Sequence, residues 1–253
     1  MTDFIAALPM YDWPESRAEV DAEWASMRTR LLAQGVNAPL HLVRRNADMP
    51  PVPGGIRDAS GAVIAPDPAT LPPNDLDRDA LWKHPKLLFA QACWGPLEQG
   101  LGQYVRVLGQ PDYSDYEGGE GQYYSSAVVM RTGEAPPATD DWSSVPLDLL
   151  RGKRFAYNSD DSMSGKIAFM RDLEAMGEDL SIFSEHVETG GHRGSIIAVA
   201  EGRADVAAID CRSWALAQRF EPLAAKVVVV GWTSRRKGLP FITALGSPLT
   251  KLP

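Results

Sequence analysis

The sequence predicts an α/β protein with two open sheets of mostly parallel strands. Short apolar runs typical of buried strands alternate with amphipathic runs of helical periodicity along most of its 253 residues. In the second half, turns rich in glycine and hydroxyl residues lead from strand-like to helix-like runs. With 44% hydrophobic residues, the chain can bury a large core in one domain or in two lobes.

The first elements follow from periodicity and from helix boundary signals. A buried strand is expected at residues 4–8, and Pro14 can begin a helix. Gly35 ends that helix, and a second strand is expected at residues 40–43, which would complete a βαβ unit. The helix itself is predicted from four apolar residues at helical spacing: Val20, Trp24, Met27 and Leu31.

An irregular segment and a long strand separate the two halves. Residues 49–73 are dominated by proline and glycine, which excludes a regular helix and leaves room for a small hairpin near residues 57–64. A buried strand at residues 123–131 is long enough to pass from one lobe to another, and a loop follows at 132–144. Between these segments the pattern indicates strands at 86–92 and 104–108, a short helix at 96–100, and a loop at 110–122.

The remaining chain alternates strand and helix. Strands are expected at 154–158, 186–188, 206–209, 226–230 and 240–243, and helices at 165–176, 195–201 and 213–220. In open α/β sheets, ligands bind beyond the carboxyl ends of the strands. Six candidate residues lie at such predicted ends: Tyr11, Trp94, Asn158, Ser162, Thr189 and Asp210.

Charge and composition exclude several classes of partner. The net charge of −8 argues against nucleic acid and anionic membranes, because a phosphate-binding face needs clustered Lys and Arg. Even the most strongly apolar run, residues 227–230, is far shorter than the roughly 20 residues that span a bilayer. The start Met1-Thr2-Asp3 lacks the basic residues of a secretory signal, which favours a cytoplasmic protein. The two cysteines and four histidines show no metal or redox spacing, so no metal or cofactor is expected.

Two turns carry the chemistry of an anion site. Residues 158–165 and 189–195 each join a strand to a helix. The first N–H groups of a helix lack internal partners and lie at its positive end, where an oxyanion is stabilised. Ser162, Ser164 and Ser195 could instead be ordinary helix caps. Because two such turns occur together, we favour one shared anionic ligand.

Several stretches resemble the substrate-binding proteins of phosphate, phosphite and phosphonate ABC transporters, a branch of the type II periplasmic binding proteins. They follow the family's order over most of the chain: Leu8-Pro-Met-Tyr-Asp12, Leu87-Leu-Phe-Ala-Gln-Ala-Cys-Trp-Gly95, Leu150-Arg-Gly-Lys-Arg-Phe-Ala-Tyr-Asn158, Ser162-Met-Ser-Gly165, Thr189-Gly-Gly-His192 with Ser195, Gly202-Arg-Ala-Asp-Val-Ala-Ala-Ile-Asp210 and Gly238-Leu-Pro-Phe-Ile-Thr243. The resemblance implies two α/β lobes joined by crossing hinge strands, with the ligand held between them. We expect lobe 1 at residues 1–128 with 229–253, and lobe 2 at residues 129–228.

The resemblance also implies a set of ligand-binding residues. Lobe 2 would supply the donors to a phosphonate-like oxyanion, and lobe 1 would cover its other side. Asp210 would be a poor neighbour for an anion unless the ligand also carries an ammonium group, which suggests an amino-phosphonate; it could equally be a helix cap. The donors would be Asn158, Ser162, Ser164, Gly165, Thr189, Gly191, His192 and Ser195, and the covering side chains Tyr11 and Trp94.

The family implies a monomer that works with an ABC permease in the periplasm and is not an enzyme. The chain departs from the pattern in three ways. It shows no export signal, it ends at Pro253 soon after the last predicted strand, and Trp94-Gly95 stands where relatives have smaller or tyrosyl residues. Two alternatives use the same scaffold: a cytoplasmic metabolite sensor, or an enzyme similar to the pyrimidine synthases of the thiamine pathway. A triad of Ser162, His192 and Asp210 would serve the enzyme, although Ser162 does not lie in a Gly-x-Ser-x-Gly turn.

Overall fold

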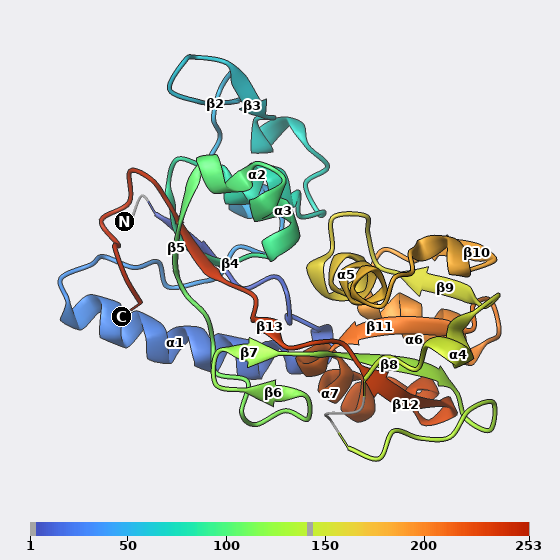
Figure 1. Cartoon of the computed structure of the whole chain (residues 1–253). Helices are drawn as coiled ribbons and strands as arrows, with labels where there is room; N and C mark the ends of the chain where they lie inside the picture. Colours follow the sequence, from blue (N-terminus) through green and yellow to red (C-terminus); the bar gives the residue numbers. More distant parts are fainter. Residues whose placement is uncertain (1–3, 141–143, 253) are drawn as a thin grey trace. The chain divides into compact units, whose positions relative to one another are not determined.

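A computed structural model describes residues 4–140 and 144–252. It divides the chain into two compact units (Figure 1). Unit 1 consists of the residues up to Gln110 together with those from Leu239, and unit 2 of Pro111–Gly238, so the chain passes between the units twice. A division by compact units does not show where a hinge lies. The predicted lobe limits at residues 128 and 229 therefore stay a prediction. Residues 1–3 of the start, and 141–143 of the predicted loop at 132–144, lie outside the described residues.

Unit 1 is built on a sheet with the strand order β1-β4-β14-β5. Strand β4 runs parallel to β1 and antiparallel to β14, which is in turn antiparallel to β5. Three strands therefore point the same way and β14 alone opposes them. The bounds are β1 Ile5–Ala7, β4 Leu87–Gln91, β5 Val105–Gly109 and β14 Phe241–Ala244.

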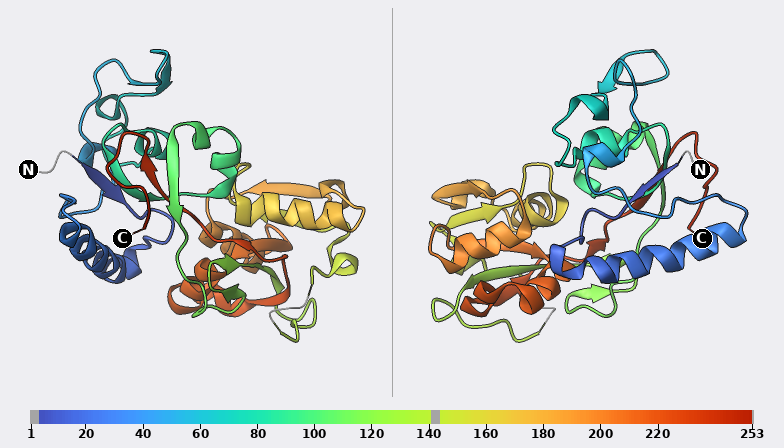
Figure 2. Two further views of the ribbon diagram at one scale, coloured as in Figure 1. Left: turned by 60° about the vertical axis from the view of Figure 1, so that its left-hand side comes forward. Right: turned by 180° about the vertical axis from the view of Figure 1, so that it is seen from behind.

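The long helix α1, Arg17–Ala33, covers one face of this sheet (blue in Figures 1 and 2). All four apolar residues predicted for it are buried. Trp24 packs on Phe89 of β4 with ring centroids 6.0 Å apart, and its indole N–H donates to Pro39 O at 3.2 Å. The predicted helix is confirmed, and Gly35 with φ +78° follows it.

The opposite face of the sheet is covered by the irregular segment that follows α1. Met49, Ile56 and Trp82 share a buried cluster with β1 and β4. The predicted hairpin is confirmed as β2 Ile56–Arg57 and β3 Val63–Ala65, which stand out from the unit (Figure 1). The short helices α2, Arg78–Trp82, and α3, Trp94–Glu98, flank β4; the sequence did not predict α2.

The strand predicted at residues 40–43 is wrong. The segment makes one ladder-like hydrogen bond, from Val43 N to Ala6 O at 2.7 Å, and then turns away. Pro39 lacks an N–H to donate and the Leu40 side chain is 64% exposed, so the segment cannot extend the sheet. The partner of β1 is β4, and the βαβ connection therefore includes the whole irregular segment.

Unit 2 has a five-stranded sheet with the order β10-β9-β11-β8-β12. Only β8 runs against the other four strands. The predicted strand at 123–131 is divided at Ser125, since β7 pairs with β6 and β13 in a separate small sheet. The bounds are β6 Gly119–Glu120, β7 Tyr123–Tyr124, β8 Ser126–Arg131, β9 Arg154–Tyr157, β10 Glu185–Glu188, β11 Val206–Asp210, β12 Val227–Trp232 and β13 Arg236–Lys237.

Helices pack on the large sheet of unit 2 and fill its core. Phe169 and Leu173 of α5 meet Phe155 of β9, with 5.1 Å between the centroids of the two Phe rings. Strand order and orientation agree with the predicted α/β fold of two open, mostly parallel sheets. The helices are α4 Leu147–Leu150, the π-helical turn η5 Met163–Ile167, α5 Ala168–Ala175, α6 His192–Ala200 and α7 Cys211–Phe220.

An ion-pair network joins three strands of this sheet. Asp205 accepts from Arg154 Nε at 3.0 Å and Nη2 at 2.7 Å, from Arg154 N at 2.9 Å, and from Arg131 Nη2 at 3.3 Å. The bonds from Arg154 hold the pKa of the Asp205 carboxyl well below its ordinary value. The carboxylate fixes the start of β11 against β9 and β8.

We expect Asp205→Asn to lower the free energy of unfolding by about 1.5–3 kcal/mol at pH 7, because hydrogen bonds to a charged group are lost. The folded-state pKa is depressed, so this stabilisation is complete above the ordinary Asp pKa of about 3.9 and disappears as the pH falls through the folded-state value. Urea unfolding from pH 7 to pH 3 measures the difference between variant and wild type, which should shrink on acidification. Glu178→Gln, which breaks the more exposed Arg151–Glu178 pair, is the control and should cost less than about 1 kcal/mol. A difference that does not change with pH would contradict the assignment.

Candidate functional site

The predicted donors of unit 2 gather at one edge of its sheet. Strands β9, β10 and β11 are parallel in the order β10-β9-β11, so their carboxyl ends lie together. Asn158 follows β9 directly, Thr189 follows β10, and Asp210 is the last residue of β11. The two turns predicted to bind an anion therefore leave the sheet side by side.

The first turn is a π-helical turn rather than the start of an α-helix. The Ser162 carbonyl accepts from both Lys166 N at 3.2 Å and Ile167 N at 3.0 Å, and the Ser162 hydroxyl accepts from Gly165 N at 3.0 Å. The helix predicted from residue 165 thus begins at Met163, with one wide turn before α5. Such turns are frequent at functional sites. Ser162 is a helix cap, and its hydroxyl hydrogen remains a donor for another group.

The second turn is held to β9 and leads into a helix without a side-chain cap. Thr189 donates from its N and its Oγ1 to Tyr157 O, both at 2.9 Å, and its Oγ1 lies 2.7 Å from Ser195 Oγ. Helix α6 begins at His192, and its N-cap residue Gly191 is extended and offers no side chain to the first amides. The amino end of α6 therefore has no side-chain cap from Gly191, and its positive dipole end favours an anion.

One hydrogen bond connects the two turns. Ser164 Oγ lies 2.9 Å from His192 Nε2. The tautomer of the ring decides which atom donates. If the imidazole donates, the Ser164 hydroxyl hydrogen is left for a ligand; if Ser164 donates, its oxygen can still accept a hydrogen bond. The helix starts at Met163 and His192 therefore converge and do not face apart.

A buried serine on β8 donates a hydrogen bond to the backbone of Ser164. Ser126 Oγ, on β8, donates to Ser164 O at 2.9 Å, and Ser126 N donates to Thr233 Oγ1 at 2.8 Å. The sequence did not predict roles for Ser126 and Thr233, because Ser126 begins a strand and ligand residues are expected at the carboxyl ends of strands. Ser195, one of the predicted donors, is fully buried, so in this structure its hydroxyl supports Thr189.

Asn158 and Gly165 approach each other closely. A Cβ built on Gly165 would lie 1.8 Å from Asn158 Oδ1 and 2.8 Å from Asn158 Cγ. This glycine is therefore required by space and not by its backbone conformation. Asn158 Oδ1 is buried without a hydrogen-bond partner among the described residues, which is costly for a polar atom.

The cations beside the two turns are engaged by the protein itself. Lys166 Nζ pairs with Asp160 and lies 4.3 Å from the ring centroid of Tyr157. Burial raises the pKa of Tyr157, so its hydroxyl stays protonated at neutral pH. Arg193 Nε donates to Glu221 at 2.8 Å. A ligand at the two turns would therefore meet hydroxyl, imidazole and backbone N–H groups rather than these cations.

Asp210 acts as a helix cap in the structure. It is 1% exposed, and its Oδ1 accepts from Ser213 N at 2.9 Å in the first turn of α7. In the sheet it lies opposite Ser126, the residue that holds Ser164 O. The geometry therefore supports the capping interpretation. Through Ser126, Asp210 also lies next to the residue that is hydrogen-bonded to Ser164.

Tyr11 and Trp94 belong to unit 1. Tyr11 follows β1, and Trp94 is the first residue of α3 after β4. Because β1 and β4 are parallel neighbours, both aromatic residues follow the carboxyl edge of their own sheet, as predicted. Tyr11 is 2% exposed and Trp94 is partly buried against the core of the unit.

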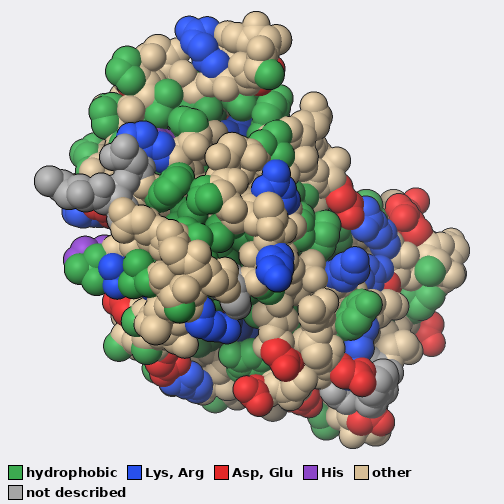
Figure 3. All heavy atoms as spheres, turned by 90° about the vertical axis from the view of Figure 1, so that its left-hand side faces the viewer, with side chains coloured by type: hydrophobic (Ala, Val, Ile, Leu, Met, Phe, Trp, Pro, Cys, Tyr) green, Lys and Arg blue, Asp and Glu red, His purple; other side chains and the backbone are tan. Residues whose placement is uncertain are grey.

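Residues 4–140 and 144–252 also lack a metal-binding cluster of side chains and a membrane-spanning helix. Within that range no three His, Cys, Asp or Glu side chains are grouped to hold a metal ion. No helix in the same residues is long and apolar enough to cross a bilayer. Cys93 and Cys211 are buried and are not joined in a disulfide. Lys and Arg side chains on the face in Figure 3 are scattered among acidic and apolar ones.

The comparisons with known proteins point to one family. The family model of the phosphonate-specific periplasmic substrate-binding proteins of ABC transporters matches residues 103–244. PhnD1 from Prochlorococcus marinus (MIT 9301), solved in complex with methylphosphonate, shares 13% identity over 96% of this chain and 77% of its own, with a TM-score of 0.61. A binding protein component of an ABC phosphonate transporter from Pseudomonas aeruginosa shares 12% identity over 98% of this chain and 70% of its own, with a TM-score of 0.60. No curated protein matches the chain.

At these identities the structural likenesses establish the fold alone, and they confirm the predicted type II periplasmic binding protein fold. The family assignment rests on the sequence model, which covers more than half of the chain. The protein belongs to the phosphonate-binding family of periplasmic ABC-transporter substrate-binding proteins.

Proposed function

We propose that the protein captures a small phosphonate-like oxyanion for an ABC-type permease, and that the two turns of unit 2 hold the anion. The observation that carries this proposal is the Ser164–His192 hydrogen bond, which places one turn beside the uncapped amino end of α6. Membership of the substrate-binding family supports it. We expect a periplasmic monomer that meets its permease partner when loaded.

The proposed site recognises charge through neutral donors and the helix dipole. The proposal places the anion at the start of α6, beside the hydroxyls of Ser162 and Ser164. Gly191 leaves space there, with no atom within 4 Å of a built Cβ. Donors of this kind satisfy several oxygens of one anion without placing an unpaired cation in the empty site. Tyr11 and Trp94 are the side chains we propose to cover the ligand from unit 1.

Asp210 bears on whether the ligand also carries an amino group. The Asp210 carboxylate would repel a simple anion held at the first turn, and it would attract an ammonium group on the ligand. Its use as the cap of α7 offsets part of its charge through the dipole of that helix. We therefore propose a simple alkylphosphonate as the first ligand to test, with an aminoalkylphosphonate as the comparison.

An enzymatic role on the same scaffold has one observation in its favour. Ser164 Oγ and His192 Nε2 have the spacing of a nucleophile and its base. However, Asp210, the carboxylate of the imagined triad, caps α7, and the serine in contact is Ser164 rather than Ser162. Turnover of a p-nitrophenyl ester that is lost in Ser164→Ala would favour this alternative.

The first test is a ligand panel of phosphate, phosphite, methylphosphonate, 2-aminoethylphosphonate and sulfate. A ligand at a hundred times its Kd adds about 2.7 kcal/mol of stability, which raises the Tm by about 5–10 °C for a chain of this size. We expect this shift with methylphosphonate, and calorimetric titration then gives the Kd. Tighter binding of 2-aminoethylphosphonate would assign Asp210 to the ligand. No shift with any of the five at millimolar concentration would refute the proposal.

Gly191→Asp should separate binding from folding. An aspartate at this N-cap satisfies the first amides of α6 and favours its dipole, so stability should be unchanged or rise by up to about 1 kcal/mol. The same carboxylate would occupy the anion position and repel the ligand, and affinity for methylphosphonate should fall by roughly a hundredfold or more. Gly191→Asn is the matched control, with the same cap and no charge, and should lose much less. Equal losses in both variants would argue against an anionic ligand at this position.

Gly165→Ala tests the narrow space in the first turn. The added methyl would collide with Asn158, and overpacking of this kind costs about 1–3 kcal/mol. In an Asn158→Ala background the same substitution should cost far less, because the obstructing amide is gone. Thermal unfolding of the wild type, the two single variants and the double variant measures the coupling free energy between residues 158 and 165. Additive costs would mean that the turn has another reason to need glycine.

A further inference from the structure

A short segment of unit 1, residues 8–13, carries the predicted ligand residue Tyr11 and has no regular structure. Its backbone is folded on itself and on the start of the next helix. Trp13 N donates to Tyr11 O at 2.9 Å. Ser16 Oγ lies 3.1 Å from Tyr11 O and 3.2 Å from Trp13 O. These contacts fix one side of the segment to the helix.

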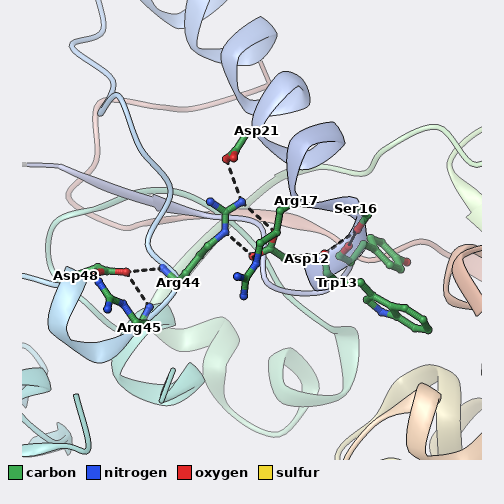
Figure 4. A network of polar contacts seen from close by, with 9 residues as sticks. Asp12, Trp13, Ser16, Arg17, Asp21, Arg44, Arg45 and Asp48 are labelled. Carbon is green, nitrogen blue, oxygen red and sulfur yellow. Dashed lines mark hydrogen bonds and ion pairs between the residues drawn. The ribbon is translucent and has the colours of Figure 1, made fainter. Parts of the chain in front are cut away.

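The other side is held mainly by the ion pair between Arg44 and Asp12 (Figure 4). Arg44 donates from Nε to Asp12 Oδ2 at 2.7 Å and from Nη2 to Asp12 Oδ1 at 3.0 Å, a two-point contact. The same Nη2 reaches Asp21 Oδ1 on α1 at 3.0 Å. The Asp12 side chain is 12% exposed and that of Arg44 23%. A planar, two-point contact fixes orientation as well as distance.

Arg44 is itself anchored before it reaches Asp12. Asp48 Oδ2 accepts from Arg44 N at 3.1 Å and from Arg45 N at 3.0 Å. The residue before it, Val43, is hydrogen-bonded to β1 through Ala6 O. The backbone of Arg44 is therefore held in place, and its guanidinium connects Asp12 to Asp21 on α1.

The charges of this network cancel, which argues for a structural task. Arg17, Arg44 and Arg45 face Asp12, Asp21 and Asp48 in the four ion pairs of the network. A second anion would gain little from cations that are already paired. In Figure 4 the indole of Trp13 points away from the ion pairs, so the network holds the backbone while the aromatic side chain remains outside it.

We propose that Arg44 is a positioning residue for ligand binding: through Asp12 it holds residues 11–13 in the conformation that presents the aromatic side of unit 1. The proposal rests on the proposed function, in which Tyr11 covers the ligand. On this proposal Arg44 raises the affinity for the ligand through Asp12, without contacting the ligand itself.

The experiment compares Arg44→Met, Asp12→Asn and the double variant with wild type. The matched control is Arg45→Met, which removes the adjacent arginine from its own aspartate and leaves Asp12 untouched. Calorimetry with methylphosphonate and with phosphate at 20 °C gives the affinities of proteins that thermal unfolding shows to be folded. Hydrogen exchange of a peptide covering residues 9–16, without ligand, reports directly on the segment.

We expect Arg44→Met to weaken binding by roughly tenfold and to speed exchange in residues 9–16, with neither effect in the control. Because Arg44 acts through Asp12, the double variant should be no worse than either single variant, and Arg44→Lys should restore only part of the affinity. Wild-type affinity and exchange in Arg44→Met would overturn the proposal, as would equal losses in Arg45→Met. If the wild type binds neither anion, the proposed function fails, and the role of Arg44 in ligand binding fails with it. Unchanged hydrogen exchange of residues 9–16 in Arg44→Met would separately show that Arg44 does not hold the segment.

Discussion

The site in unit 2 depends on the hydrogen bond between Ser164 and His192. Each residue follows a different strand, and each stands in the first turn of a different helix. Without this contact the structure would contain two separate helix starts, one capped by Ser162 and the other preceded by Gly191. With it, the two turns lie side by side, which is the geometric basis for proposing a shared anion.

The sheet provides the alignment that makes this contact possible. Parallel neighbours end at one edge, so Asn158, Thr189 and Asp210 come together although they are far apart in sequence. In each large sheet a single strand runs the other way, β14 in unit 1 and β8 in unit 2. In unit 2 that strand carries Ser126, whose bond to Ser164 O connects the site to the centre of the sheet.

Much of this could be predicted from the sequence, because apolar runs and glycine-hydroxyl turns are local signals. The strands and helices of the second half and the convergence of the turns at Ser162 and Thr189 followed from them. The strand expected at residues 40–43 did not form, since an exposed Leu40 after a proline cannot extend a sheet, and an apolar run does not reveal its neighbours. The π-helical turn at Met163 was also missed, because helical periodicity does not distinguish a wide turn from an ordinary one.

Contacts between distant residues were beyond the sequence for a different reason. The pairing of Arg44 with Asp12 and the placement of Ser126 beneath Ser164 depend on which segments the fold brings side by side. Nothing in the spacing of these residues marks them. The ligand-binding roles of Tyr11, Trp94 and the donors of unit 2 remain predictions.

The carbonyl of Ser164 is fixed by a strand rather than by a flexible loop, and Thr189 is fixed to β9 in the same way. Both turns are consequently preorganised before any guest arrives. A guest then loses its own freedom of motion but imposes little loss of conformational entropy on its host.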